Sequence, residues 1–363
     1  MARALIALIA AGATIIAAPA ALADAPKRPD LLDRPAAAAP HAGQQLLLAA
    51  AYAGKRIVAV GQGGEILLSD DDARSWHLAN FVPTSVTLTG VAFANDHEGW
   101  VIGHLGIVLH TSDGGMTWQR QLDGIQAALV SLSAAQREAH DVPGDVSTKA
   151  LRLARMGVEE GPDKPFLALI VKDPRHVTVL GAYGMAYGTD DGGKTWSPVD
   201  RRFSNAEGLH YYGANLYAGE LVLVGERGMV LRGPEGGQLI PMRTPYGGSF
   251  FGVVQGGPST LIAYGLQGTI VVSHDSGATW KKMETGVTTS FEAGTVLSDG
   301  TIVLASESGQ VVVSQDGGDH FAIQPVLVEP AAGLLPLGGA SVLVVGPRGA
   351  QRFNVFGKTE YSK

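Results

Sequence analysis

An eight-residue motif recurs along this chain, and its spacing limits the folds that the chain can adopt. The motif reads Ser/Thr-x-Asp-x-Gly-x-Ser/Thr-Trp, and its copies lie at residues 69–76, 111–118, 189–196, 273–280 and 314–321. The first copy has Ala73 where the glycine belongs, and the last is looser and ends in Phe321. Neighbouring copies lie either roughly 40 residues apart or about twice that distance apart, and a period near 40 is typical of propeller blades or a solenoid. Strand-rich units with a glycine turn in each favour the β-propeller.

The octet has a mechanical interpretation as the turn of a β-hairpin. Its carboxylate can accept hydrogen bonds from the N–H groups of the turn, and its glycine supplies a positive φ at little steric cost. The tryptophan begins the outgoing strand and can pack against the neighbouring blade. We therefore assign structural roles to Asp71, Asp113, Asp191, Asp275, Asp316, Trp76, Trp118, Trp196 and Trp280. Five carboxylates with one local role do not suggest metal ligands or catalytic acids, so no metal-binding or catalytic residue is predicted.

A second marker counts the repeats independently of the octet. A Gly-x-x-Gly tetrad joins two apolar runs ahead of each octet position, and the tetrads lie at residues 61–64, 103–106, 181–184, 225–228, 265–268, 306–309 (with serine first) and 346–349. Seven tetrads predict an all-β, seven-bladed propeller of four-stranded antiparallel blades. In the last repeat, residues 354–356 are the candidate for a final strand.

One long spacing between tetrads hides an insertion at residues 121–163, between blades 2 and 3. Its composition predicts a helix over residues 124–140 and a second over residues 147–156, which Ser147 can cap and Gly157 can end. Two interpretations stay open. The helical hairpin either covers the side of one blade or serves as an arm that docks a partner, since long insertions in compact folds are often functional.

The remaining segments suggest an exported protein. Residues 1–23 have a positive start, an apolar stretch and a small-residue cleavage site, which is typical of a signal peptide; a retained membrane anchor is the alternative. Residues 24–42, rich in Ala and Pro, are expected to be a mobile linker, residues 43–357 the propeller and residues 358–363 a tail. The absence of cysteine suits the periplasm, and a net charge of −7 gives no indication of nucleic-acid binding.

The tetrads are the candidate binding site. Each is a loop at the opposite end of its strand from the octet, so all seven should surround the channel on one face, and binding residues commonly lie on loops held by a rigid scaffold. The predicted partner-binding residues are His104, Tyr183, Glu226, Arg227, Gln267, Glu307 and Arg348. The segment 210–212 (His-Tyr-Tyr) is a further aromatic candidate, with packing in the core as its alternative role.

The octets resemble the Asp-box, or bacterial neuraminidase repeat, of sialidase-like propellers. Residues 99–118 more specifically resemble the repeat of the photosystem II stability/assembly factor family. That resemblance implies a non-enzymatic factor, without cofactor or small-molecule substrate, which binds a polypeptide segment of a membrane protein complex through the arginine-bearing face. In non-photosynthetic bacteria it implies a partner such as an exporter of the resistance-nodulation-division type.

The alternative function is a sialidase-like glycoside hydrolase or a carbohydrate-binding propeller. Such sialidases hold a substrate carboxylate with an arginine cluster, because the planar guanidinium binds carboxylates bidentately, and they use a tyrosine nucleophile. Here Arg227 and Arg348 lie in tetrads, and residues 55–58 (Lys-Arg-Ile-Val) only faintly resemble the sialidase Arg-Ile-Pro signature. A third tetrad arginine is missing, so the binding function is preferred.

Overall fold

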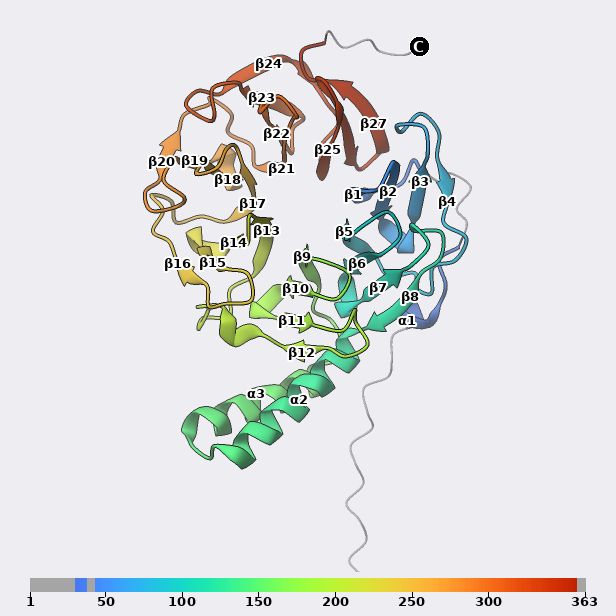
Figure 1. Ribbon diagram of the computed structural model, residues 1–363, viewed down its shortest axis with the longest axis vertical. Coiled ribbons are helices and arrows are strands. Elements are labelled where there is room, and N and C mark those ends of the chain that lie inside the picture. The colour runs from blue at the N-terminus through green and yellow to red at the C-terminus, as the bar shows by residue number, and fades with distance from the viewer. Residues whose placement is uncertain (1–29, 38–42, 358–363) are drawn as a thin grey trace, which may run out of the picture.

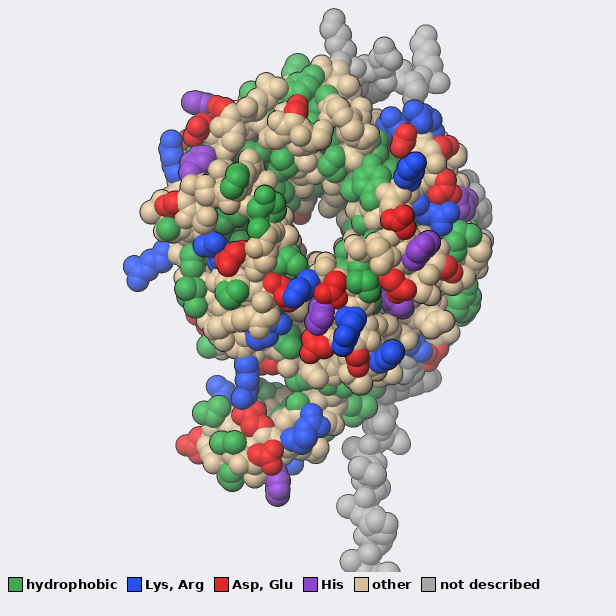
Figure 2. Space-filling view, in the orientation of Figure 1, with side chains coloured by type: hydrophobic (Ala, Val, Ile, Leu, Met, Phe, Trp, Pro, Cys, Tyr) green, Lys and Arg blue, Asp and Glu red, His purple; other side chains and the backbone are tan. Residues whose placement is uncertain are grey.

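The computed structural model describes residues 30–37 and 43–357, so the expected signal peptide and C-terminal tail lie outside the described residues. Seven antiparallel sheets stand around a central channel, with the first strand of each sheet innermost (Figure 1). The predicted seven-bladed, all-β propeller is confirmed. Figure 2 shows the open channel from one face.

Six blades have four strands and the seventh has three, joined in sequence order. The strands of blades 1 to 3 are β1 (Leu47–Ala53), β2 (Arg56–Gly61), β3 (Ile66–Ser69), β4 (His77–Leu78), β5 (Leu88–Phe93), β6 (Gly99–Gly103), β7 (Val108–Thr111), β8 (Gln119–Leu122), β9 (Phe166–Val171), β10 (Val177–Gly181), β11 (Ala186–Thr189) and β12 (Ser197–Pro198). Those of blades 4 to 7 are β13 (Tyr211–Tyr217), β14 (Glu220–Gly225), β15 (Val230–Pro234), β16 (Ile240–Pro241), β17 (Phe250–Gln255), β18 (Leu261–Gly265), β19 (Ile270–Ser273), β20 (Lys281–Met283), β21 (Phe291–Val296), β22 (Ile302–Ser306), β23 (Gln310–Ser314), β24 (Ala322–Leu327), β25 (Gly333–Gly338), β26 (Ser341–Gly346) and β27 (Gly349–Asn354).

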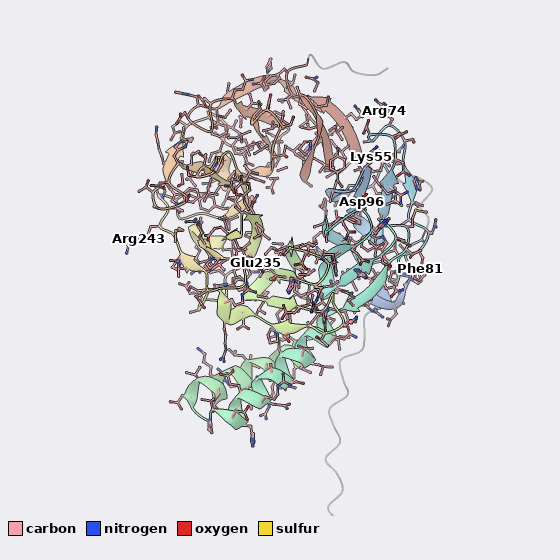
Figure 3. The ribbon with its side chains drawn as sticks, viewed as in Figure 1. Lys55, Arg74, Phe81, Asp96, Glu235 and Arg243 are labelled. Atoms are coloured by element: carbon pink, nitrogen blue, oxygen red, sulfur yellow. The ribbon has the colours of Figure 1, made fainter. Side chains whose placement is uncertain are left out.

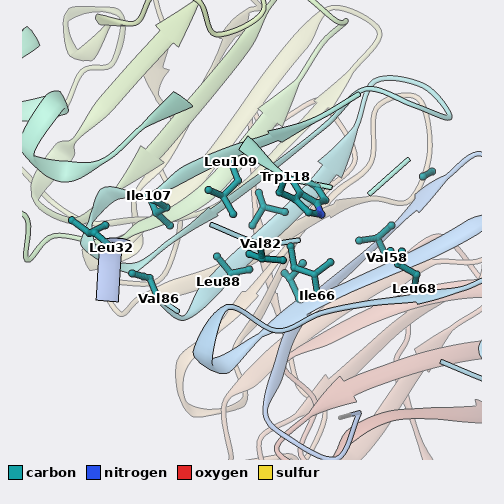
Figure 4. Packing of buried hydrophobic residues seen from close by; sticks show 13 residues of the cluster. Leu32, Val58, Ile66, Leu68, Val82, Val86, Leu88, Ile107, Leu109 and Trp118 are labelled. Atoms are coloured by element: carbon teal, nitrogen blue, oxygen red, sulfur yellow. The ribbon is translucent and has the colours of Figure 1, made fainter. Parts of the chain in front are cut away.

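The hydrophobic core is divided among the seams between blades. Every residue of second strands such as β6, β18 and β22 is buried, because a neighbouring blade covers each face of the sheet. In the seam between blades 1 and 2, Trp118 packs with Val58 and Leu68 and is fully buried (Figure 4). The octet tryptophan thus contributes to the seam with the preceding blade, where a large aromatic side chain removes much apolar surface from water.

The octet carboxylates accept bonds from their own turns. Asp113 accepts the Thr117 N–H at 2.9 Å and the Thr117 hydroxyl at 2.6 Å, and the Thr111 hydroxyl donates to it at 2.8 Å. The other four octet aspartates make equivalent bonds. Gly115 adopts a φ of 90°, while Ala73 takes the same place in the first octet with a φ of 62°. These turns are closed locally and leave little carboxylate capacity for other ligands.

The last blade departs from the prediction of four strands, because residues 354–356 are not a strand. The Gly357 N–H donates to the Asn354 carbonyl at 3.0 Å and closes a turn, and Val355 is buried in the seam with blade 6. Blade 7 closes on blade 1 through side chains, including Leu343 and Leu47. The Tyr52 hydroxyl also donates to the Pro336 carbonyl at 2.8 Å. Among the described residues, the ring therefore closes by packing and not by an exchanged strand.

The linker expected over residues 24–42 does not fit residues 30–37. The short helix α1 (Asp30–Asp33) buries Leu32 completely in the seam between blades 1 and 2. The Ser85 N–H donates to the Leu31 carbonyl at 3.0 Å, and an Arg120 guanidinium N–H donates to the Leu32 carbonyl at 2.7 Å. These tertiary contacts hold a segment whose composition alone suggested a linker.

The insertion forms the predicted helical hairpin, with α2 (Gly124–Asp141) and α3 (Asp145–Glu160) projecting from blade 3 in Figure 1. Asp123 caps α2 by accepting the Ile125 and Gln126 N–H groups at 3.1 and 3.0 Å. The expected limits of the second helix were wrong. Ser147 lies inside α3 and donates backwards to the Val142 carbonyl at 2.8 Å, and the helix continues past Gly157 to Glu160.

Candidate partner-binding face

The Gly-x-x-Gly tetrads all lie at one end of the blades. Each connects the second strand to the third, whereas each octet connects the third to the fourth, so the two sets occupy opposite faces. We call the tetrad side the ring face. Blades 1 to 5 carry short 3-10 turns, η1 (Gln62–Gly64), η2 (His104–Gly106), η3 (Ala182–Gly184), η5 (Glu226–Gly228) and η6 (Leu266–Gly268). The middle residue of each turn has a positive φ, which presents Tyr183, Arg227 and Gln267 at the turn apex.

The predicted residues on the ring face are accessible but do not form one cluster. His104, Gln267 and Glu307 are exposed, and the side chains of Arg227 and Arg348 are 73% and 74% exposed. These two arginines belong to blades 4 and 7, on opposite sides of the channel (Figure 1). They share the predicted face, yet they cannot grip a single small anion together.

Each ring-face arginine has a partner carboxylate, which is exposed for Glu207 and half-buried for Glu329. Arg227 pairs with Glu207 at 2.8 Å and Arg348 with Glu329 at 2.9 Å. Surface ion pairs of this kind contribute roughly 0–1 kcal/mol. A partner's carboxylate could therefore replace Glu207 or Glu329 at little cost in free energy.

An aromatic row crosses blades 3, 4 and 5. The rings of Tyr183 and His210 lie 4.7 Å apart, His210 stacks on Tyr212 at 6.1 Å, and Tyr212 meets Phe251 edge-on at 5.5 Å. Glu226 fixes the histidine, with an Oε2 to Nδ1 distance of 2.7 Å. Tyr183, which is 62% exposed, also lies beneath the Lys164 ammonium at 5.8 Å.

The 210–212 segment is divided between the core and the surface. Tyr211 is in the core, where burial raises its pKa to about 12, whereas His210 and Tyr212 are only half-buried. Tyr212 and Phe251 occupy the bulges at the starts of β13 and β17, where the strand register shifts. A bulge leaves one residue outside the ladder, and this frees both rings. Phe251 was not predicted, although its place after the buried Phe250 matches that of Tyr212 after Tyr211.

A groove of about 1040 Å³ lies between the helical hairpin and blade 3, and Tyr183 borders it. Ala128 and Ala135 line its α2 wall, while Met185 and Val199 line its blade 3 wall. Ion pairs between Arg201 and Glu138 and between Lys164 and Glu160 lie at its margins. The hairpin does not cover blade 3 tightly, since Ala127, Ala135 and Ser147 are its only buried residues among those described.

Charged side chains also lie away from the ring face. Figure 2 shows acidic, basic and histidine side chains beside the channel over blades 2 and 3, and Figure 3 places Lys55 and Asp96 nearer the channel than Arg74, Phe81 and Arg243. Lys172 pairs with Glu235 at 2.6 Å, and the His110 ring lies 2.6 Å from the Glu98 carboxylate. Within residues 30–37 and 43–357, no group of three His, Cys, Asp or Glu side chains is placed to hold a metal ion. In the same ranges, no helix is long and apolar enough to span a bilayer.

The repeats match known proteins. The family model described as Photosynthesis system II assembly factor YCF48 matches residues 60–126 and 79–140. Photosystem II assembly protein Ycf48 of Synechococcus sp. (strain JA-2-3B'a(2-13)) is 30% identical over 130 residues, which cover 32% of this chain and 38% of that protein. Over this part of the propeller, the chain is similar to photosystem II assembly factors.

Solved structures share the propeller fold of this chain. YCF48 bound to D1 peptide gives a TM-score of 0.61 at 18% identity, covering 86% of this chain and 94% of that one. YCF48 from Cyanidioschyzon merolae gives 0.63 at 16% identity, covering 86% and 96%. The WD40 β-propeller domain of Doa1 gives 0.59 at 12% identity, covering 88% and 95%.

Proposed function

We propose that this protein is a non-enzymatic assembly or accessory factor that works in the periplasm. It binds a polypeptide segment of a membrane protein complex through the ring face. The observation that carries the proposal is the aromatic row from Tyr183 to Phe251, flanked by the exposed Arg227. Exposed aromatic and arginine side chains are the residues most often responsible for binding energy at protein interfaces.

The family resemblance supports this proposal. The matching family model is described as an assembly factor, and one solved propeller of this kind is a YCF48 bound to a D1 peptide. An exporter of the resistance-nodulation-division type is one membrane complex that an exported relative could serve, and this identity stays a prediction.

The arginine geometry favours protein binding over the glycoside hydrolase alternative. Arg227 and Arg348 lie across the channel from each other. Arg56 begins β2 near the octet end and is held by Asp70 at 2.7 Å. Arg56, Arg227 and Arg348 therefore do not converge on one carboxylate, as a sialidase-like clamp requires.

Affinity capture from membranes tests the proposal. The tagged mature protein, cross-linked in cells, should recover a membrane protein complex. Replacing Tyr183 and Tyr212 with alanine should reduce recovery about tenfold or more, because aromatic anchors are worth on the order of 2 kcal/mol each. Arg243→Ala is the matched control, since Arg243 is exposed on the outer rim (Figure 3).

Two results would contradict the proposal. Recovery that is equal for the aromatic variant and the control would exclude the ring face as the contact surface. Turnover of sialosides by the purified protein, without a membrane partner, would favour the enzyme.

A further inference from the structure

The outer edge of the last blade is open. In blades 1 to 6 a fourth strand pairs with the third, whereas β27 is the outermost strand of a three-stranded sheet (Figure 1). No other described strand pairs with its free edge. Natural proteins usually cover, shorten or charge such edges, because the unpaired N–H and C=O groups form a template for another strand.

The other blades show which backbone groups this edge offers. In blades 1, 3 and 4, the carbonyls of Ile66, Ala186 and Val230 accept an N–H from the fourth-strand side at 2.9, 2.9 and 2.8 Å. These three residues each pair with the residue just before the tetrad on the second strand. In blade 7 the pairing of Val345 with Ala350 occupies that same position, so the Ala350 backbone faces outward.

Strand alternation extends this assignment along β27. Outward-facing residues alternate with residues that bond to β26, so Arg352 and Asn354 follow Ala350 at the edge. Val355 follows Asn354 and therefore faces the opposite way: its N–H donates to the Ala340 carbonyl at 2.9 Å, on the side of β26. Arg352 and Asn354 are exposed and Ala350 is half-buried, so a strand can reach this edge.

Charge defines the kind of strand that fits. The side chain of Arg352 lies on the blade 1 side and donates to the Asp72 carbonyl. Among the described residues no carboxylate lies within ion-pair distance of its guanidinium. Opposite charges directly across neighbouring strands are favourable, so an acidic side chain opposite Arg352 would complete its contacts.

We propose that the β27 edge binds an extended segment of a partner polypeptide as the fourth strand of blade 7. The segment runs antiparallel to β27, bonds to the backbone of Ala350, Arg352 and Asn354, and places an acidic residue opposite Arg352. This is strand addition to an exposed sheet edge, in which main-chain bonds give affinity and side chains give specificity. The surface is separate from the aromatic row, so the inference does not depend on the proposed function.

A synthetic peptide tests the edge in the full-length mature protein. The probe is a fluorescent hexapeptide of alternating threonine and valine with one central aspartate, and binding is followed by anisotropy. Two analogues of the peptide, N-methylated at different backbone amides, test whether the β27 backbone recognises the peptide, and they leave the protein unchanged. Methylation of the amides that face β27 should weaken binding at least about tenfold, whereas methylation of the alternate amides should not, because each blocked bond costs on the order of one hydrogen bond.

Protein variants give matched controls. Ala350→Pro removes one outward N–H and should weaken binding about tenfold, whereas Gln351→Ala, whose backbone bonds to β26, should not. Arg352→Glu should weaken binding of the aspartate probe and improve binding of the same peptide with lysine in its place. Arg227→Ala on the ring face should bind the probe normally.

Hydrogen exchange decides among possible occupants of the edge. Slower exchange at the Ala350 and Arg352 amides only when the peptide is added supports the proposal. Equal binding of the two methylated analogues would overturn it. Slow exchange at these amides in the free protein would also overturn the proposal. If this protection disappears on truncation after Gly357, the edge binds the chain's own tail. If it rises with protein concentration, the edge binds a second copy of the protein.

Discussion

At the scale of residues, the octet aspartates have a structural role, because their carboxylate oxygens accept hydrogen bonds from their own turns. Asp275 accepts the Thr279 hydroxyl at 2.6 Å, the Thr279 N–H at 2.8 Å and the Ser273 hydroxyl at 2.8 Å. The bond from the Thr279 hydroxyl, followed by the one from its N–H, lowers the pKa of Asp275 to about 2. Asp191 is held in the same way by Thr195, and its pKa is also lowered to about 2.

These lowered pKa values predict how stability depends on pH. A carboxyl group whose folded pKa is about 2, against an ordinary value of 3.8, stabilises the fold above pH 4. That contribution is lost as the pH falls from about 4 to about 2. Urea unfolding of the wild type should therefore show a steep decline in stability over this range. The Asp191→Asn and Asp275→Asn double variant should show a shallower decline, and identical slopes would contradict the assignment.

Residue roles differed in how far the sequence could predict them. The octet bonds were predictable because donor and acceptor lie within eight residues of each other. The ring-face pairs were not, since Glu207 and Glu329 come from connections between blades, 20 and 19 residues away from their arginines. Whether the ring-face residues bind a partner stays a prediction.

At the scale of elements, the tetrad spacing predicted the strands well because each blade repeats one pattern of apolar runs. Helix α1 could not be predicted, since four residues are too few to form a helix without tertiary contacts. The limits of α3 were misjudged because Ser147 and Gly157 match capping signals that local packing did not use. The strand expected at residues 354–356 gave way to a turn that buries Val355 in the seam with blade 6.

The helical hairpin should be dispensable for folding of the propeller. The two ends of the hairpin lie close together. A Cβ atom added to Gly124 would lie 2.7 Å from the Pro162 side chain. Replacing residues 124–161 with a short glycine-serine linker should leave a folded propeller with the strand-rich circular dichroism spectrum of the wild type. The main loss is on blade 3, where the Tyr187 hydroxyl no longer meets Ser131 and the Ala127 carbonyl.

A point variant isolates that contact. Tyr187→Phe in the intact chain removes the same hydrogen bonds and should cost about 1 kcal/mol. An insoluble or unfolded deletion variant, beside a stable Tyr187→Phe protein, would show that the hairpin is part of the folding unit. If the deletion variant is stable and keeps its membrane partner, the hairpin is not the docking arm.

At the scale of the whole molecule, one seam joins the first blade of the propeller to the last. Leu343 of blade 7 is fully buried against Leu47, Ile57 and Leu67 of blade 1. Only side chains and a few hydrogen bonds hold this seam among the described residues, since no strand crosses it.

Shortening a buried side chain in this seam should destabilise the whole propeller. Leu343→Ala should lower the free energy of unfolding by about 2–5 kcal/mol, which is the range for a buried leucine. Leu327→Ala is the matched control, because Leu327 is 61% exposed and surface changes usually stay within about 0.5 kcal/mol. Denaturant titration measures the free energy of unfolding of both variants. An equal loss in the two would contradict the role of this seam in stability.

Because no described strand crosses from blade 7 to blade 1, the ring does not depend on the order in which its blades are connected. The Gly43 carbonyl lies next to Gly349, so the beginning of the propeller already touches its final hairpin. A circular permutant can therefore join the original N- and C-termini with a short linker and begin at a new N-terminus in the connection between blades 4 and 5. Such a circularly permuted chain should assemble the same seven-fold architecture.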